Sequence, residues 1–216
     1  MKGKRSVFGY TLGEEIMNAV THGIGALLGV AGTAVLIVLS ALKGDVWWIV
    51  TSAIYGFTLI LLFTMSTIYH ALKPNRAKKV FRVFDHASIY LLIAGTYTPI
   101  TLGVMRNALG WVLFSVVWGI SILGIVLNSI SIEKFKKISM IFYILTGWAV
   151  IMAVKPMLML MSVKSLVLML LGGIAYTGGI AFFAMKKVKY MHGIWHVFVL
   201  LGAVLQYFAV LLEIVK

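Results

Sequence analysis

The amino-acid sequence predicts an all-α, polytopic membrane protein built as a bundle of seven transmembrane helices. Of its 216 residues, 62% are hydrophobic and only 12% are charged, and the mean hydropathy is +1.04. A soluble domain of this length could not carry such a composition on its surface. The apolar runs are also too long and too numerous for a secretory signal peptide. We therefore expect the chain to cross the membrane repeatedly.

Seven apolar runs are long enough to span a bilayer, which takes about 20 residues per helix. Their predicted bounds are 16–42, 46–72, 83–105, 109–132, 138–154, 165–185 and 190–214. Residues 1–15 then form a short basic tail, and residues 16–214 form one transmembrane domain with short loops and no linker. The boundary between the fifth and sixth spans is the least marked, because Lys155, Pro156 and Lys164 interrupt the pattern there.

Small residues and one proline give three of these spans individual features. Gly25 and Gly29 in the first span, like two glycine pairs in the sixth, are expected to let helix backbones approach closely. Pro99 should bend the third span or free a carbonyl group, and Thr96 and Thr98 can bond locally beside it. We assign these residues to packing and not to chemistry.

Basic residues indicate how the spans are oriented. Fourteen of the 19 Lys and Arg residues fall in the tail and in the second, fourth and sixth loops, and five fall on the other side. Cytoplasmic loops carry the excess of basic residues. The N-terminus is therefore predicted to be cytoplasmic and the C-terminus outside, in a multi-pass protein of the plasma membrane. The net charge of +13 then reflects topology and attraction to anionic headgroups, so membrane lipids and not nucleic acid are the expected partners.

Two pairs of polar residues lie four apart within the apolar spans. His192 and His196 open the last span, and Ser66 precedes His70 at the end of the second. Residues four apart share one face of a helix. Ionisable groups at membrane depth are costly and usually functional, so these histidines are candidate site residues.

The remaining histidines are expected at the same depth in the membrane as these two pairs. His22 follows Asn18 by four residues at the start of the first span, and Asp85 and His86 open the third. With the predicted topology, all five histidines lie within roughly 5 to 10 Å of the cytoplasmic boundary, at 1.5 Å per residue. In a protein with seven spans, five histidines could lie near both faces of the membrane. Because all five lie near one face, we predict that they form one site.

A metal site is the interpretation that this layer favours. The chain has no cysteine, so a site for a soft metal must use histidine and carboxylate. His70, His192 and His196 would supply three neutral imidazoles to Zn²⁺ at about 2.0 to 2.1 Å, leaving a fourth position for water. Asp85 is expected to be the sole acid buried deeply enough to orient that water or take its proton, since Glu14, Glu15 and the other acids lie at helix ends or in loops.

Each of these residues also has a structural alternative. A histidine in a membrane helix can serve packing or hydrogen bonding, Ser66 can bond to the carbonyl four residues earlier, and Asp85 can pair with Arg82. His86 lies about 100° around the helix from Asp85, so we place it outside the metal ligands. His22 and Asn18 are expected to surround the ligands.

Four motifs extend these pairs over most of the chain. They are SxxxH at 66–70, FDH at 84–86 followed by IYLLIAGTYTP at 89–99, ExxNxxTHGIG at 15–25, and HxxxH at 192–196. Together they resemble the hemolysin III family, the bacterial branch of the progestin and adiponectin receptor family. The resemblance spans residues 14–207.

The resemblance implies seven helices, an intracellular N-terminus and a zinc site near the cytoplasmic face. In the adiponectin receptors the zinc is held by the histidines of SxxxH and HxxxH, and the aspartate of the third helix reaches it through water. Those positions correspond here to His70, His192, His196 and Asp85. The long N-terminal domain of the receptors has no counterpart, so hormone reception is not expected.

Two functions follow as hypotheses. The first is a zinc-dependent intramembrane hydrolase of a lipid amide or ester, in which a zinc-activated water attacks, Asp85 acts as general base, and Ser66 bonds to the water, Asp85 or the oxyanion. The wider superfamily includes alkaline ceramidases, which favours an amide. The second is a non-enzymatic protein with a structural zinc site, either pore-forming and cytolytic or serving membrane homeostasis.

Two other cofactors are not expected. A retinal Schiff base needs a buried lysine, and residues 190–214 contain none. Bis-histidine haem ligation is allowed by residue type, but we expect no haem, which an absence of Soret absorbance would test.

Overall fold

The first helix begins at a capping box. In the computed structural model, which describes residues 9–185 and 187–216, the Thr11 side chain accepts a hydrogen bond from the Glu14 amide, and the Glu14 carboxylate accepts one from the Thr11 amide. This exchange satisfies amides that have no partner inside a helix. Helix α1 (Leu12–Lys43) therefore starts four residues before the predicted bound of 16. Residues 1–8 of the predicted basic tail lie outside the described residues.

Helices follow one another through the rest of the chain, and no strand occurs among the described residues. They are α2 (Val46–Ala71), α3 (Arg76–Thr98), the π-helical turns η1 (Pro99–Met105), α4 (Ala108–Gly147), the 3₁₀ turn η2 (Ala149–Ala153), α5 (Val154–Leu160), α6 (Val163–Ala184) and α7 (Met191–Ile214). Within the described ranges, six segments are long and apolar enough to cross a membrane. The predicted all-α, polytopic membrane class is confirmed.

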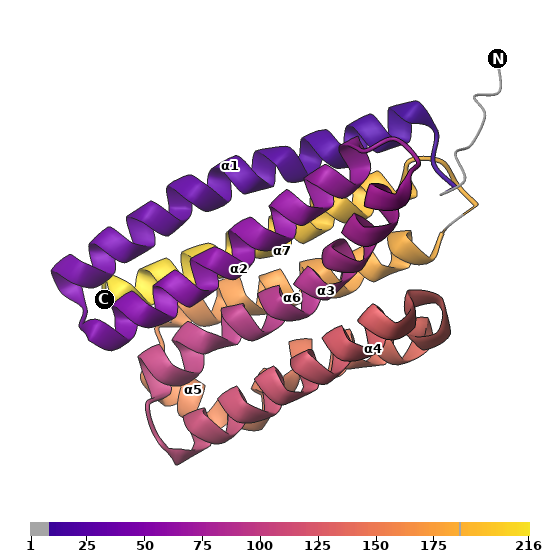
Figure 1. The fold of residues 1–216 in the computed structure, drawn as a ribbon. Helices are drawn as coiled ribbons and strands as arrows, with labels where there is room; N and C mark the ends of the chain where they lie inside the picture. The colour runs from indigo at the N-terminus through magenta and orange to yellow at the C-terminus, as the bar shows by residue number, and fades with distance from the viewer. Residues whose placement is uncertain (1–8, 186) are drawn as a thin grey trace.

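Helix α4 contains a reversal at Ser131, whose φ of −167° and ψ of 108° are extended. The Ser139 hydroxyl donates to the Asn128 side-chain oxygen at 2.6 Å, although eleven residues of straight helix would separate them by about 16 Å. The two halves of α4 therefore lie side by side, as the turn at one end of α4 in Figure 1 shows. The predicted loop at 133–137 is wrong, because those residues are helical and the chain turns two residues earlier. The count of seven crossings and the sides of the termini stay predictions.

Pro99 changes the helix type, as its missing amide requires. The α-helical pattern of α3 ends at Thr98, and π-helical turns run to Met105. Hydroxyl groups of Thr96, Thr98 and Thr101 each donate to the carbonyl four residues earlier. These hydroxyl groups add hydrogen bonds within the protein around the irregular segment, where backbone at membrane depth needs them.

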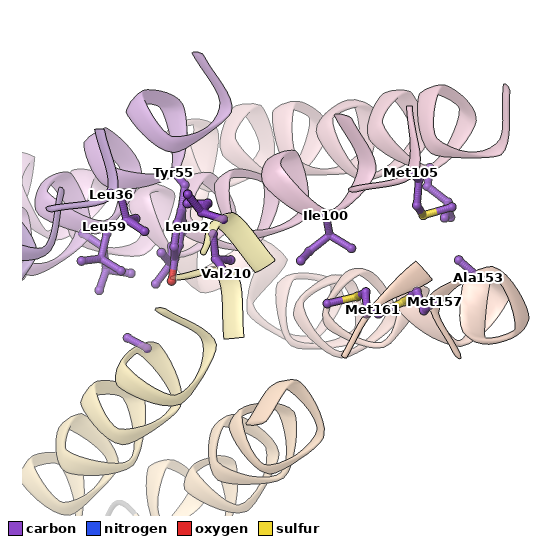
Figure 2. Close-up of a cluster of buried hydrophobic side chains, with 14 of the residues drawn as sticks. Leu36, Tyr55, Leu59, Leu92, Ile100, Met105, Ala153, Met157, Met161 and Val210 are labelled. Atoms are coloured by element: carbon purple, nitrogen blue, oxygen red, sulfur yellow. The ribbon is translucent and has the colours of Figure 1, made fainter. Parts of the chain in front are cut away.

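The helices form a bundle in which α2 packs between α1 and α3, and α7 packs between α1 and α6 (Figure 1). The end of α2, the start of α3 and the start of α7 lie at the end of the bundle where α1 begins. One core cluster contains Leu36, Tyr55, Leu59, Leu92 and Val210, all almost fully buried. Figure 2 shows it continuing through Ile100 to three methionines near α5.

Glycine sets two of the closest helix approaches. A Cβ atom at Gly25 would lie 2.6 Å from the Phe63 ring on α2, and one at Gly124 would lie 2.2 Å from the Tyr90 ring on α3. Both are far inside van der Waals contact, so only glycine permits these approaches. The prediction that Gly25 serves packing agrees with this geometry.

We predict that Gly124→Ala lowers the melting temperature of the purified protein, because the added methyl group must displace the buried Tyr90 ring. Overpacking of this kind costs about 1–3 kcal/mol. Gly119→Ala is the matched control on the same helix, since a Cβ there meets nothing within 4 Å. Equal thermal shifts in the two variants, measured by fluorescence in detergent, would contradict the assignment.

Candidate metal centre

Three helices bring the predicted ligands together at one end of the bundle. His70 lies in the last turn of α2, and His192 and His196 lie in the first two turns of α7. Helix α1 is packed against both α2 and α7. The backbone amide of Tyr190 donates to the Glu14 carboxylate at 3.0 Å, which holds the start of α7 against the start of α1.

The ligand atoms of His70, His192 and His196 all lie within 4.8 Å of one another. The Nε2 atoms of His192 and His196 are 3.1 Å apart. Two nitrogens bound at about 2.0 to 2.1 Å to one tetrahedral zinc ion would be about 3.3 Å apart. The three side chains could therefore hold one metal ion, as the spacing of the motifs predicted.

The other ring nitrogens determine which atoms face the metal position. Nδ1 of His196 lies 3.3 Å from the backbone oxygen of Asn18, which can only accept, so Nδ1 carries the proton and Nε2 keeps its lone pair. Nδ1 of His70 lies 2.7 Å from a carboxylate oxygen of Glu15, so we assign its proton in the same way. Nε2 of His70 is buried and has no hydrogen-bond partner among the described residues. Such an unsatisfied lone pair fits a metal ligand.

Asn18 and His22 both contact the ligands from α1. Asn18 is fully buried, and its side-chain nitrogen lies 3.3 Å from Nδ1 of His70. We treat that approach as a packing contact, since the shorter Glu15 contact already takes the Nδ1 proton. His22 stacks on His196 with ring centroids 3.6 Å apart and planes 10° apart. Neither of its ring nitrogens has a partner among the described residues, and it stands outside the three-histidine group.

Three other predicted site residues are not among the converging histidines: Asp85, Ser66 and His86. Asp85 is buried at 9% exposure and does not belong to the group whose ligand atoms converge. The buried Ser66 hydroxyl has no partner among the described residues, so the expected bond to the carbonyl four residues earlier is not formed. His86 is also not part of the group of three histidines. The catalytic roles of Asp85 and Ser66 stay predictions.

Tyr10 covers the site just before α1 begins. Its ring centroid is 4.9 Å from that of His192 and 5.8 Å from that of His70. Burial is the main cause that raises the pKa of the Tyr10 phenol, and neighbouring acidic groups, Asp85 and Glu15 among them, raise it further. Tyr10 therefore stays protonated and can donate a hydrogen bond toward the site.

The prediction that Asp85 is the sole acid buried near the site is wrong. Glu15 is also buried, at 9% exposure, and it contacts both His70 and the buried Lys78. The sequence places Glu15 near a helix end, where solvent usually reaches. The available signal was its spacing, since Glu15, Asn18 and His22 share one face of α1. Nothing in the sequence pattern singled out Lys78 among the loop lysines.

Two cavities adjoin the histidines. One of about 150 Å³ is mainly apolar and runs between α3, α4, α6 and α7, from His22 and Asp85 to Gln206. The other, of about 240 Å³, is more polar and is lined by His192, Arg82 and Lys136. Their common wall consists of Asp85, His86, Ile89, Phe183 and Trp195.

Comparison with known proteins places this geometry in a family. The family model described as haemolysin-III related matches residues 10–207. The chain belongs to the haemolysin III family. The predicted resemblance is thereby confirmed, and the matched residues include every predicted ligand.

The relatives of this haemolysin III family protein cover almost its whole length. It is 41% identical to the hemolysin-3 homolog of Bacillus subtilis (strain 168), over 96% of this chain and 97% of the relative. It is 40% identical to hemolysin-3 of Bacillus cereus, over 92% and 90%. It is also 29% identical to the human monocyte to macrophage differentiation factor, over 91% and 83%. No solved structure matches the chain.

We predict that purified wild-type protein carries about one divalent metal ion and that His70→Ala, His192→Ala and His196→Ala each lose it, because each removes one of three ligands. Elemental analysis of detergent-purified protein measures the stoichiometry. His86→Ala is the control, since His86 lies outside the group. Retention of metal in any ligand variant, or its loss in the control, would contradict the site.

Proposed function

We propose that this haemolysin III family protein is a zinc-dependent intramembrane hydrolase that cleaves a lipid amide or ester. The observation that supports it is that His192 of the three-histidine group lines a polar cavity, and Asp85 lies in the wall that this cavity shares with an apolar one. An apolar cavity suits a hydrocarbon chain, and a polar one suits the headgroup next to it. The bond between chain and headgroup would then lie beside the histidines.

Zinc is the metal that this donor set favours. Three imidazole nitrogens with no thiolate suit zinc better than calcium or magnesium, which prefer oxygen ligands. A set of three protein ligands also leaves a coordination position open, as catalytic zinc sites do. When bound, zinc would polarise a substrate carbonyl and lower the pKa of a water molecule toward 7.

The chain's own residues would provide the proton transfers and the orientation. Asp85 lies in the wall between the two cavities, where it can hold the attacking water and accept its proton. The Ser66 hydroxyl is buried and unpartnered among the described residues, so it is available to donate to that water, to Asp85 or to a developing oxyanion. The stacked His22 limits how far the His196 ring can move.

The lining of the apolar cavity suits part of an acyl chain. Its wall includes Trp195, Val199 and Gln206, which span about 16 Å along α7 at 1.5 Å per residue. Phe183 and Trp195 separate this space from the polar cavity. A lipid could therefore place its chain among the helices and its headgroup near Arg82 and Lys136.

Mutation of the proposed base tests the reaction. We expect purified protein to hydrolyse members of a panel of lipid amides and esters, and Asp85→Asn to lower kcat by about 10²–10⁴-fold, the usual contribution of a general base. A chelator should abolish turnover, and zinc should restore it. Asp45→Asn, far from the site, is the control.

Turnover that survives both chelation and Asp85→Asn would refute the hydrolase. Selective ion flux in liposomes, lost in His192→Ala, would instead favour the non-enzymatic, pore-forming alternative.

We further propose that the metal centre lies near the cytoplasmic face of the plasma membrane. The basic residues Arg82, Lys136 and Lys137 lie at the same end of the bundle as the site, and basic loops are retained inside. This orientation puts the N-terminus in the cytoplasm and the C-terminus outside.

The chain has no cysteine, so single cysteines can test the orientation directly. We expect a membrane-impermeant maleimide to label Lys164→Cys in intact cells and Lys137→Cys only after permeabilisation. Both lysines are exposed. The opposite pattern of labelling would show that the orientation is inverted.

A further inference from the structure

A buried carboxylate joins the metal centre to a buried lysine. One oxygen of Glu15, Oε2, lies 2.7 Å from Nδ1 of His70, and the other, Oε1, accepts from the Lys78 ammonium at 2.8 Å. Lys78 is 1% exposed and Glu15 is 9% exposed. Each carboxylate oxygen therefore has its own partner, one of them a proposed metal ligand.

The lysine is fixed from a second direction. Its ammonium also donates to the backbone oxygen of Leu72 at 2.9 Å, and Leu72 is the C-cap of α2, two residues after His70. Lys78 itself lies in the first turn of α3. The contacts thus tie α1, the end of α2 and the start of α3 together around His70. Burying a lysine is costly unless it is paired and hydrogen-bonded, and here both conditions are met.

The Glu15 contact has a direct consequence for the His70 ring. A carboxylate accepts the Nδ1 proton, so the ring cannot turn over without losing a short, charge-assisted hydrogen bond. Nε2, which has no partner among the described residues, is then the nitrogen left to bind a metal held with His192 and His196. Carboxylate partners of this kind orient metal-bound histidines and increase their basicity.

We propose that Glu15 is a positioning residue that orients His70 as a metal ligand, and that Lys78 holds Glu15 in place. The inference rests on the metal centre of the proposed function but not on hydrolysis. A purely structural ion pair between Glu15 and Lys78 would need only one carboxylate oxygen, whereas the second oxygen makes the shorter contact, to His70.

Glu14 provides a matched control one residue away. It is buried to a similar degree, at 7% exposure. Its carboxylate caps α1 at Thr11 and accepts from the Tyr190 amide, and neither contact involves a histidine. The same Glu→Gln change at the two positions therefore separates an effect on the ligand from an effect on the helix start.

The test compares zinc affinities of full-length, detergent-purified variants by competition with a chelator. We expect Glu15→Gln to bind zinc about 10 to 100-fold more weakly than wild type, the usual effect of losing such a partner. Glu14→Gln should bind within about threefold of wild type, because the glutamine oxygen can still accept from the Tyr190 amide that holds the start of α7 in place. With cobalt in place of zinc, Glu15→Gln should also shift the visible absorption bands, which report ligand geometry, whereas Glu14→Gln should leave them unchanged.

A double variant separates an effect on zinc affinity from a loss of stability. Glu15→Gln alone removes the carboxylate that pairs with the buried Lys78, which can destabilise the fold. Glu15→Gln combined with Lys78→Met removes both charges, so we expect it to recover the melting temperature of the metal-free protein but not the zinc affinity. Recovery of affinity along with stability would overturn the positioning role.

The remaining outcomes are distinguishable. Wild-type affinity and an unchanged cobalt spectrum in Glu15→Gln would overturn the inference, while the metal centre would stand. Equal losses in Glu14→Gln and Glu15→Gln would overturn it as well. Tight zinc binding with the expected losses but no lipid hydrolysis would support the inference and refute the proposed enzyme. If wild type binds no metal, both fail.

Discussion

Burial of imidazole rings among membrane helices is the constraint on which the rest of this structure depends. A buried ring nitrogen without a partner is costly, because an unsatisfied polar group at membrane depth costs several kcal/mol. His196 and His70 satisfy Nδ1 with the Asn18 carbonyl and the Glu15 carboxylate. Each ring then has Nε2 left to bind a metal, and the ligand atoms of His70, His192 and His196 lie within 4.8 Å of one another.

The helix arrangement serves this convergence. His70 ends one helix and His192 begins another, so the two helices must present their ends at the same level. Helix α1 packs against both and contributes Glu15, Asn18 and His22 to the space between them. Glycines such as Gly25 allow that packing to be close. The same arrangement leaves the two cavities beside α3, α4, α6 and α7.

The local pattern of apolar residues predicted most of the helices, and it failed where contacts between helices determine the structure. The apolar runs predicted that long helices follow one another along the chain, because bilayer thickness sets their length, although α3 begins at Arg76, seven residues before the predicted bound. The turn in α4 was placed at charged residues 133–137, yet it occurs at Ser131, where bonds from Asn128 to the returning segment hold the two halves together. Likewise, the sequence pattern indicates that Glu15 is a solvated residue in the first turn of a helix. In the structure, His70 on α2 and Lys78 on α3 both contact its carboxylate.

The sequence by itself determined the membrane class, the family and the identity of the three converging histidines. Composition, spacing of four residues and joint motifs are all properties of a linear chain. Only the tertiary structure decided how His70 is held. Glu15 lies 55 residues before His70 and 63 residues before Lys78 in the sequence, and the three residues are on three different helices. No periodicity connects such distant positions; they meet only because helix packing brings one end of α1 against the end of α2 and the start of α3.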